Sequence, residues 1–166
     1  MPALETGVQA PEISLSFLDD SKFSLKDALK KGPVVAAFFK VSCPVCQLAF
    51  PYLERIFKAY AKNAKFTLVG VSQDNAADTK AFNREFGVTF PVLLDEIGKY
   101  PASKTYGLTN VPTVFVISPE GEIESSTVGW SKADMNELNQ KLARLSNTGP
   151  IQIFPPGEKV PEFKPG

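Results

Sequence analysis

Hydrophobic and polar positions follow two distinct periods in this chain, and together they predict alternating strands and helices. Residues 34–39 are apolar at every position, which is typical of a central strand covered on both faces. From 44 to 62 the apolar residues recur every three or four positions, which predicts a helix with Pro44 in its first turn and Pro51 inside it. A further apolar stretch at 66–72 predicts the next buried strand.

The first part of the chain has the pattern of a hairpin. Apolar and polar residues alternate from Val8 to Phe17, and the polar residues at 18–21 predict a turn into a return strand at 22–24. A short helix is expected at 25–30, because Ser24 resembles a helix cap and the following Gly-Pro pair ends the segment.

The rest of the chain to residue 145 continues the alternation and closes on a second hairpin. Helices are predicted at 75–86 and 98–106, and a last one runs from a Ser131 cap to Leu145. Strands are predicted at 90–94, 113–117 and 122–128. Strands that alternate with helices and end in a hairpin predict an α/β sheet with a mixed edge.

Residues 147–166 differ from the preceding chain in composition. Ile151–Phe154 is β-prone and predicts an added strand, whereas the prolines that follow predict an extended segment. The apolar residues of this stretch suggest that part of it docks on the domain or on a neighbouring subunit. We therefore divide the chain into a domain at 1–146 and a partly docked, proline-rich C-terminal tail at 147–166.

Composition and charge exclude several classes of function. Lys and Arg total 18, as do Asp and Glu, and this balance argues against a nucleic-acid partner. No apolar run approaches the ~20 residues that span a bilayer. The first residues lack the pattern of a signal peptide, which predicts a cytoplasmic location. The chain has no histidine, which excludes every mechanism that depends on imidazole.

The candidate chemistry lies at the junction between the strand 34–39 and the helix that follows. Cys43 and Cys46, the only two cysteines, flank Pro44 and Val45 there. Backbone N–H groups at a helix start favour thiolate over thiol, so Cys43 is the candidate nucleophile and the deeper Cys46 the resolving thiol. Lys40 is a candidate for tuning the thiol pKa, although a solvated lysine at a strand end is the simpler interpretation.

Three other interpretations of the cysteine pair compete with redox exchange. A zinc site needs about four ligands, and two cysteines without histidine do not supply them, so no metal is expected. Two inert buried thiols are a second interpretation. A peroxide-reducing thiol is the third and the most serious.

Motifs elsewhere in the chain resemble the thioredoxin-fold redoxins of the AhpC/TSA superfamily, and within it the TlpA/ResA-like thiol–disulfide oxidoreductases. The resemblance implies a thioredoxin-like fold over residues 1–146, with a central mixed β-sheet flanked by helices and an N-terminal β-hairpin extension. The stretches that carry it are Gly7–Ile13 with Leu15, Cys43-Pro44-Val45-Cys46, Pro51, Asn110–Ile117, Pro119–Ile123 and Val128-Gly129-Trp130.

The resemblance also implies a substrate site. Pro112 should follow a cis peptide bond, Val111 should offer backbone hydrogen bonds to a bound substrate strand, and Thr113 should support this arrangement. Pro44 and Val45 would complete the binding surface. The implied partners are protein thiols or disulfides and an upstream thiol electron donor, with no cofactor, and the chain is expected to be a monomer or a weak homodimer.

Two departures from the family pattern concern proton handling. Ser42 replaces the usual aromatic residue before the first cysteine, and Ala37 replaces a buried aspartate of thioredoxins. The proton acceptor for Cys46 is therefore left open between water and a carboxylate such as Asp95 or Glu96. A small neutral site predicts a high pKa for the buried thiol.

The peroxidase alternative fits the sequence less well. Peroxiredoxins carry Thr-x-x-Cys, and here Cys43 stands at the threonine position. No arginine occurs between 85 and 143, where the peroxide-poising arginine is expected. Disulfide exchange is the principal hypothesis, an antioxidant thiol peroxidase is the first alternative, and a redox-sensitive peptide-binding module is the second.

Overall fold

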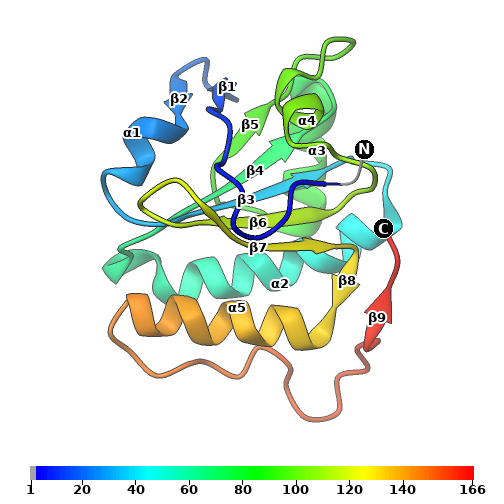
Figure 1. Cartoon of the computed structure of the whole chain (residues 1–166). Helices are drawn as coiled ribbons and strands as arrows, with labels where there is room; N and C mark the ends of the chain where they lie inside the picture. The colour runs from blue at the N-terminus through cyan, green and yellow to red at the C-terminus, as the bar shows by residue number, and fades with distance from the viewer. Residues whose placement is uncertain (1–2) are drawn as a thin grey trace.

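The computed structural model describes residues 3–166, and a seven-stranded sheet forms its centre (Figure 1). The strand order is β2-β1-β5-β4-β3-β6-β7, and β8 and β9 form a separate pair. The strands are β1 (Ser14–Phe17), β2 (Lys22–Ser24), β3 (Val34–Phe39), β4 (Thr67–Ser72), β5 (Val92–Leu94), β6 (Thr113–Ile117), β7 (Ile123–Val128), β8 (Trp130–Ser131) and β9 (Phe163–Lys164).

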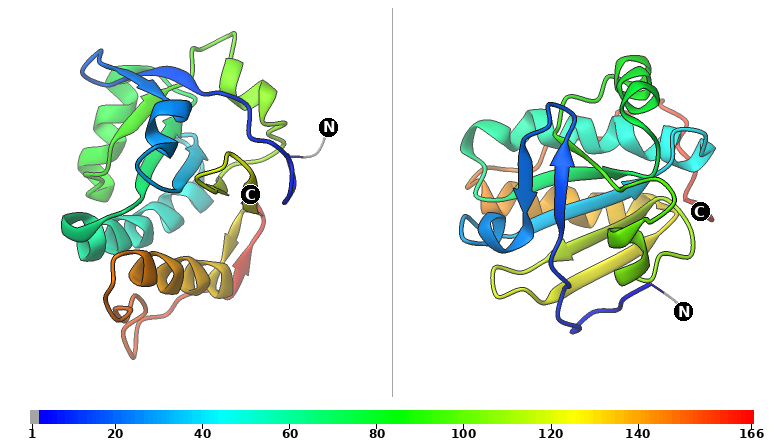
Figure 2. Two further views of the ribbon diagram at one scale, coloured as in Figure 1. Left: turned by 60° about the vertical axis from the view of Figure 1, so that its left-hand side comes forward. Right: turned by 90° about the horizontal axis from the view of Figure 1, so that it is seen from above.

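The sheet is mixed, as the sequence predicts. β3, β4 and β5 are parallel, whereas β6 pairs antiparallel with β3 and with β7. The N-terminal hairpin β1–β2 joins the opposite edge through an antiparallel pairing of β1 with β5 (Figure 2). All residues of β3 are fully buried, which confirms the central strand.

Helices cover both faces of the sheet, and the alternating side chains of β3 divide the core between them. Val35, Ala37 and Phe39 pack with α2, α3 and α5, while Val34, Ala36 and Phe38 pack with α1 and α4. Within residues 3–166, no helix is long and apolar enough to cross a membrane. The helices are α1 (Leu25–Leu29), α2 (Pro44–Tyr60), the 3-10 turn η1 (Ala61–Asn63), α3 (Ala76–Phe86), α4 (Pro101–Thr105) and α5 (Lys132–Leu145).

Helix α4 is shorter than the predicted helix at 98–106. Tyr100 has a left-handed backbone, with a φ of 42°, so the helix cannot extend back beyond Pro101. Residues 96–100 form a turn instead, in which the Tyr100 N–H donates to the Glu96 carbonyl at 2.7 Å. Pro101 then occupies the first helical position, where its missing N–H costs no hydrogen bond.

The predicted strand at 151–154 is wrong. The backbone of Ile151 bonds to side chains rather than to a strand, since its N–H donates to the Tyr60 hydroxyl at 2.9 Å and its carbonyl accepts from Asn139 at 2.8 Å. The side chain of Ile153 is buried in the core, with 1% of its surface exposed. The apolar residues at 151–154 favour a strand in the sequence, but their backbone pairs with no other strand.

The C-terminal tail docks on the domain along α2 and β8. Arg55 donates to the Ile153 carbonyl at 2.8 Å and forms an ion pair with Glu158 at 3.0 Å. The Tyr52 hydroxyl also bonds to Glu158, and the Trp130 indole N–H donates to the Pro161 carbonyl at 2.7 Å. The prediction that the tail docks in part agrees with these contacts, whereas the domain boundary at 146 stays a prediction.

We expect Phe50→Ala to lower the free energy of unfolding by about 3–5 kcal/mol, because it removes a large buried ring. Phe50 is fully buried, and its ring lies 4.3 Å from that of Phe39 and 5.6 Å from those of Phe82 and Phe90. Urea denaturation followed by circular dichroism measures the change. Ile97→Ala is the control, since Ile97 is 53% exposed. A loss for Phe50→Ala no larger than for this control would contradict the packing.

Candidate active site

Cys43 lies where β3 passes into α2, in a loop held by side chains that flank it. The N–H of Val41 donates to Asp74 at 2.8 Å, and the Gln47 side chain donates to the Val41 carbonyl at 2.9 Å. Cys43 has extended backbone angles and caps α2, which begins at Pro44. Its sulfur accepts the N–H of Cys46 at 3.2 Å, so the thiol occupies the position of a helix-capping side chain.

The two cysteines have different environments. Both are free thiols, but Cys43 is half-buried whereas Cys46 has no exposed surface. Burial raises the pKa of Cys46 well above the ordinary thiol value, and the neighbouring Cys43 side chain raises it further. This direction agrees with the high pKa expected for the buried thiol, and of the two cysteines only Cys43 is partly exposed to solvent.

The loop before β6 brings a second part of the chain to Cys43. The Val111–Pro112 peptide bond is cis, and the Cys43 thiol donates to the Val111 carbonyl at 3.4 Å. The Thr113 hydroxyl donates to the Asn110 carbonyl at 2.7 Å and holds this turn. The structure therefore places the predicted substrate-binding residues Val111, Pro112 and Thr113 beside the cysteine pair.

The other predicted site residues lie near the cysteine pair and differ in how much of each is exposed to solvent. Pro44 is exposed and Val45 half-buried in the first turn of α2. Lys40 is exposed and borders a surface cavity of about 320 Å³ that Gln73, Lys104 and Val111 also line. Lys40 is thus near the site, and its proposed role in tuning the thiol stays a prediction.

The carboxylates considered as proton acceptors for Cys46 are engaged elsewhere. Asp95 accepts the N–H groups of Ala102 and Ser103 at 3.0 and 2.8 Å, and the Ser103 hydroxyl as well. Both Asp95 carboxylate oxygens therefore hold the first turn of α4. Glu96 forms an exposed ion pair with Lys99 at 3.5 Å.

Sequence reasoning missed Asp74 and Gln47, which position the Cys43 loop. Asp74 lies two residues beyond the end of β4, at the same end of the parallel pair as the CxxC motif. The sequence did contain a signal for Asp74: it is a polar residue just beyond the carboxyl end of the strand that neighbours β3. Gln47 offered none, because a polar residue on an exposed helix turn is ordinary.

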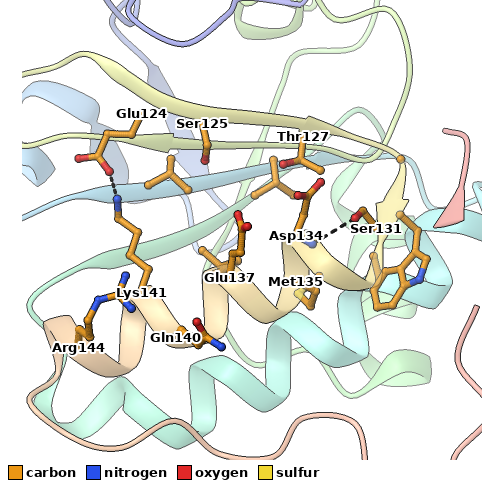
Figure 3. A pocket seen from close by; sticks show the side chains of 16 residues that line it. Glu124, Ser125, Thr127, Ser131, Asp134, Met135, Glu137, Gln140, Lys141 and Arg144 are labelled. Atoms are coloured by element: carbon orange, nitrogen blue, oxygen red, sulfur yellow. Dashed lines mark hydrogen bonds and ion pairs between the residues drawn. The ribbon is translucent and has the colours of Figure 1, made fainter. Parts of the chain in front are cut away.

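A second cavity, of about 340 Å³, opens between β7 and α5 and contains neither cysteine (Figure 3). Glu124 on β7 and Lys141 on α5 form an ion pair across it. Burial lowers the pKa of Lys141, and Arg144 lowers it further. The thiol chemistry therefore belongs to the β3–α2 junction and not to this cavity.

The fold and the free thiol pair at a helix start, beside a cis-proline loop, define an oxidoreductase of the thioredoxin type. The family model described as AhpC/TSA family matches residues 6–126. The chain belongs to the AhpC/TSA family.

Named relatives agree with this class. The thioredoxin-like protein YneN of Bacillus subtilis is 32% identical over 143 residues, which cover 84% of this chain and 79% of YneN. The thiol-disulfide oxidoreductase ResA of the same organism is 28% identical over 147 residues, covering 88% and 80%. The thioredoxin domain of a thiol-disulfide oxidoreductase from Bacteroides vulgatus superposes with a TM-score of 0.73 at 27% identity, covering 84% of this chain and 99% of that one. The names of ResA and the B. vulgatus protein favour disulfide exchange over the peroxidase alternative.

We expect iodoacetamide to alkylate Cys43 in the folded protein and to leave Cys46 unmodified. Cys46 is fully buried and its thiol pKa is raised, so it offers the reagent neither access nor thiolate. Peptide mapping by mass spectrometry after brief treatment near pH 7 measures each site. The same treatment in urea is the control and should label both cysteines. Equal labelling in the folded state would contradict the assigned order of the two thiols.

Proposed function

We propose that this chain reduces disulfide bonds in protein substrates, with Cys43 as the nucleophile and Cys46 as the resolving thiol. The observation that carries the proposal is the position of the Cys43 sulfur. It accepts the Cys46 N–H at the start of α2 and contacts the Val111 carbonyl beside the cis peptide bond. A reactive thiol beside the backbone that leads into a strand suits a substrate that binds in an extended form.

The first step is attack by the Cys43 thiolate on one sulfur of the substrate disulfide. A Cys43–substrate disulfide forms as the substrate S–S bond breaks, and the leaving thiolate takes a proton from solvent. The N–H of Cys46 donates to the Cys43 sulfur at 3.2 Å, and a hydrogen bond of this kind stabilises negative charge on sulfur before the attack.

The second step releases the substrate. Cys46 loses its proton and attacks the Cys43 sulfur, which forms the Cys43–Cys46 disulfide and frees the second substrate thiolate. Two electrons and two protons pass in total from the dithiol to the substrate. A thiol electron donor then reduces the Cys43–Cys46 disulfide and regenerates the enzyme.

Substrate binding is assigned to the surface around Cys43. Val111 contributes backbone groups, Thr113 holds the turn through its bond to Asn110, and Pro44 and Val45 lie in the first turn of α2. Pro112 is buried and shapes the turn. We assign binding to backbone groups and apolar contacts, which suits varied protein segments.

The proposal also covers the direction of electron flow, the cellular location and the oligomeric state. A cytoplasmic location is the prediction from the sequence, and thiols in that compartment are kept reduced, so the pair would act as a reductase there. The chain is proposed to act as a monomer or a weak homodimer.

We expect Cys46→Ala to accumulate mixed disulfides between Cys43 and substrate proteins, because the second step needs the Cys46 thiol. Non-reducing electrophoresis of the purified variant after incubation with oxidised protein should show adducts that a reductant dissolves. Disulfide reduction by the variant should fall by at least about tenfold in turnover, which corresponds to about 1.4 kcal/mol.

Cys43→Ala is the matched control, since it keeps Cys46 but lacks the nucleophile, and it should give no adducts. Adducts in both variants would show that Cys46 reacts directly and would overturn the assignment. Wild-type protein that consumes hydroperoxide rapidly, without adducts in Cys46→Ala, would favour the peroxidase alternative.

A further inference from the structure

The last residues of the C-terminal tail reach the candidate substrate site. β9 pairs antiparallel with β8, with Lys164 opposite Trp130 and Phe163 opposite Ser131. Beyond β9 the backbone passes Gly129, where a Cβ atom would lie 2.5 Å from the Lys164 carbonyl and 2.8 Å from the Gly166 nitrogen. A side chain at position 129 would therefore collide with the backbone of the tail.

The tip of the tail ends against the turn that carries Val111. The Asn110 side chain donates to the Gly166 carbonyl at 3.0 Å. A Cβ atom placed on Gly166 would lie 2.8 Å from the Val111 oxygen, which is the atom that accepts the Cys43 thiol. Figures 1 and 2 show the red C-terminal end close to the start of α2. The tail and the reactive sulfur thus meet at one carbonyl group.

We propose that residues 162–166 form an autoinhibitory segment that lies in the path of a substrate strand and must move aside before a protein disulfide reaches Cys43. This proposal rests on the proposed function, in which the substrate binds in extended form against Val111. The closeness of Gly166 to the Val111 oxygen leaves no room for a second backbone at that position. The tail and a substrate strand therefore exclude each other.

The tail is held more firmly at residues 151–161 than at 162–166, as expected for an anchored segment with a movable end. Residues 151–161 are firmly anchored through the buried Ile153, the Arg55–Glu158 ion pair and the hydrogen bond from Trp130 to Pro161. Beyond this anchor the side chains face outward, and Phe163 is 62% exposed. Residues 162–166 are held by the β8–β9 pairing, by a backbone bond and an ion pair between Lys132 and Glu162, and by the bond from Asn110 to Gly166. A segment that has these contacts but no buried side chain opens locally at lower cost than the core.

Two substitutions in the tail test the proposal while every residue of the cysteine site keeps its identity. Lys164→Pro removes the N–H of a strand residue and weakens the β8–β9 pairing. Gly166→Ala adds a Cβ that collides with the Val111 oxygen and displaces the tip. Lys164→Gln is the matched control, because it removes the same charge and keeps the N–H. All three should unfold in urea like the wild type, since 164 and 166 are exposed.

The experiment compares how fast two thiol reagents of different size label Cys43 in the folded protein. For Lys164→Pro and Gly166→Ala we expect labelling of Cys43 by a polymer-linked maleimide to accelerate by about two- to tenfold, the factor expected for the loss of one hydrogen bond. Labelling by iodoacetamide, which is small, should change less. The rate at which these two variants reduce a disulfide-bonded peptide should rise by about the same factor as their rate of maleimide labelling. Lys164→Gln should match the wild type in every assay.

The proposal is overturned if both loosened variants label at the wild-type rate, or if peptide reduction falls in them, which would make the tail part of the binding surface. An equal change for both reagents would also overturn it, because that result indicates altered thiol reactivity rather than access. If no variant reduces the peptide, the proposed function fails, but the ratio of the two labelling rates still decides whether the tail controls access.

Discussion

The antiparallel pairing of β3 with β6 is the constraint on which the rest of this site depends. Phe38 lies opposite Thr113, so the end of β3 adjoins the beginning of β6. The residues just beyond these ends, Cys43 and Val111, are 68 positions apart in sequence and nevertheless share a hydrogen bond. Because both strands are buried at the centre of the sheet, the register cannot slip without moving side chains to the opposite face.

The same central position explains why the two thiols differ. β3 is fully buried on both faces, and α2 begins after the loop 40–43, so the first turn of the helix carries Cys46 inward and leaves Cys43 partly exposed. Ala37 puts an apolar side chain in the core beneath the site. Apolar surroundings disfavour a charged thiolate at Cys46, and this burial raises the pKa of its thiol.

Local periodicity was enough to predict most of the fold. The apolar run at 34–39 and the three-to-four spacing after Pro44 correspond to β3 and α2. Both signals come from neighbours along one element, and no long-range contact is needed to recognise them. Cys43 and Cys46 followed from composition and spacing, whereas the part played by Val111 and Pro112 came from the family resemblance.

The errors and omissions involve contacts that no local pattern encodes. At Ile151 the sequence suggested a strand, but Tyr60 and Asn139 satisfy its backbone. Asp74 and Gln47 support the Cys43 loop through single side-chain bonds that leave no periodic trace. The approach of Gly166 to Val111 depends on the path of the whole tail, which a proline-rich composition does not specify.

That path couples the tail to the helix that carries the active site. The tail contacts Tyr60 near the end of α2, then Arg55 and Tyr52, and passes Trp130 before it reaches the start of the same helix. It therefore follows α2 backwards, and the helix whose first turn holds the thiols also positions the segment that covers them. Since the tail buries the Ile153 side chain near Arg55 but buries no side chain beyond Pro161, local opening is expected at the end beside Cys43. A rigid anchor and a weak tip along one helix allow access to change while the redox centre keeps its geometry.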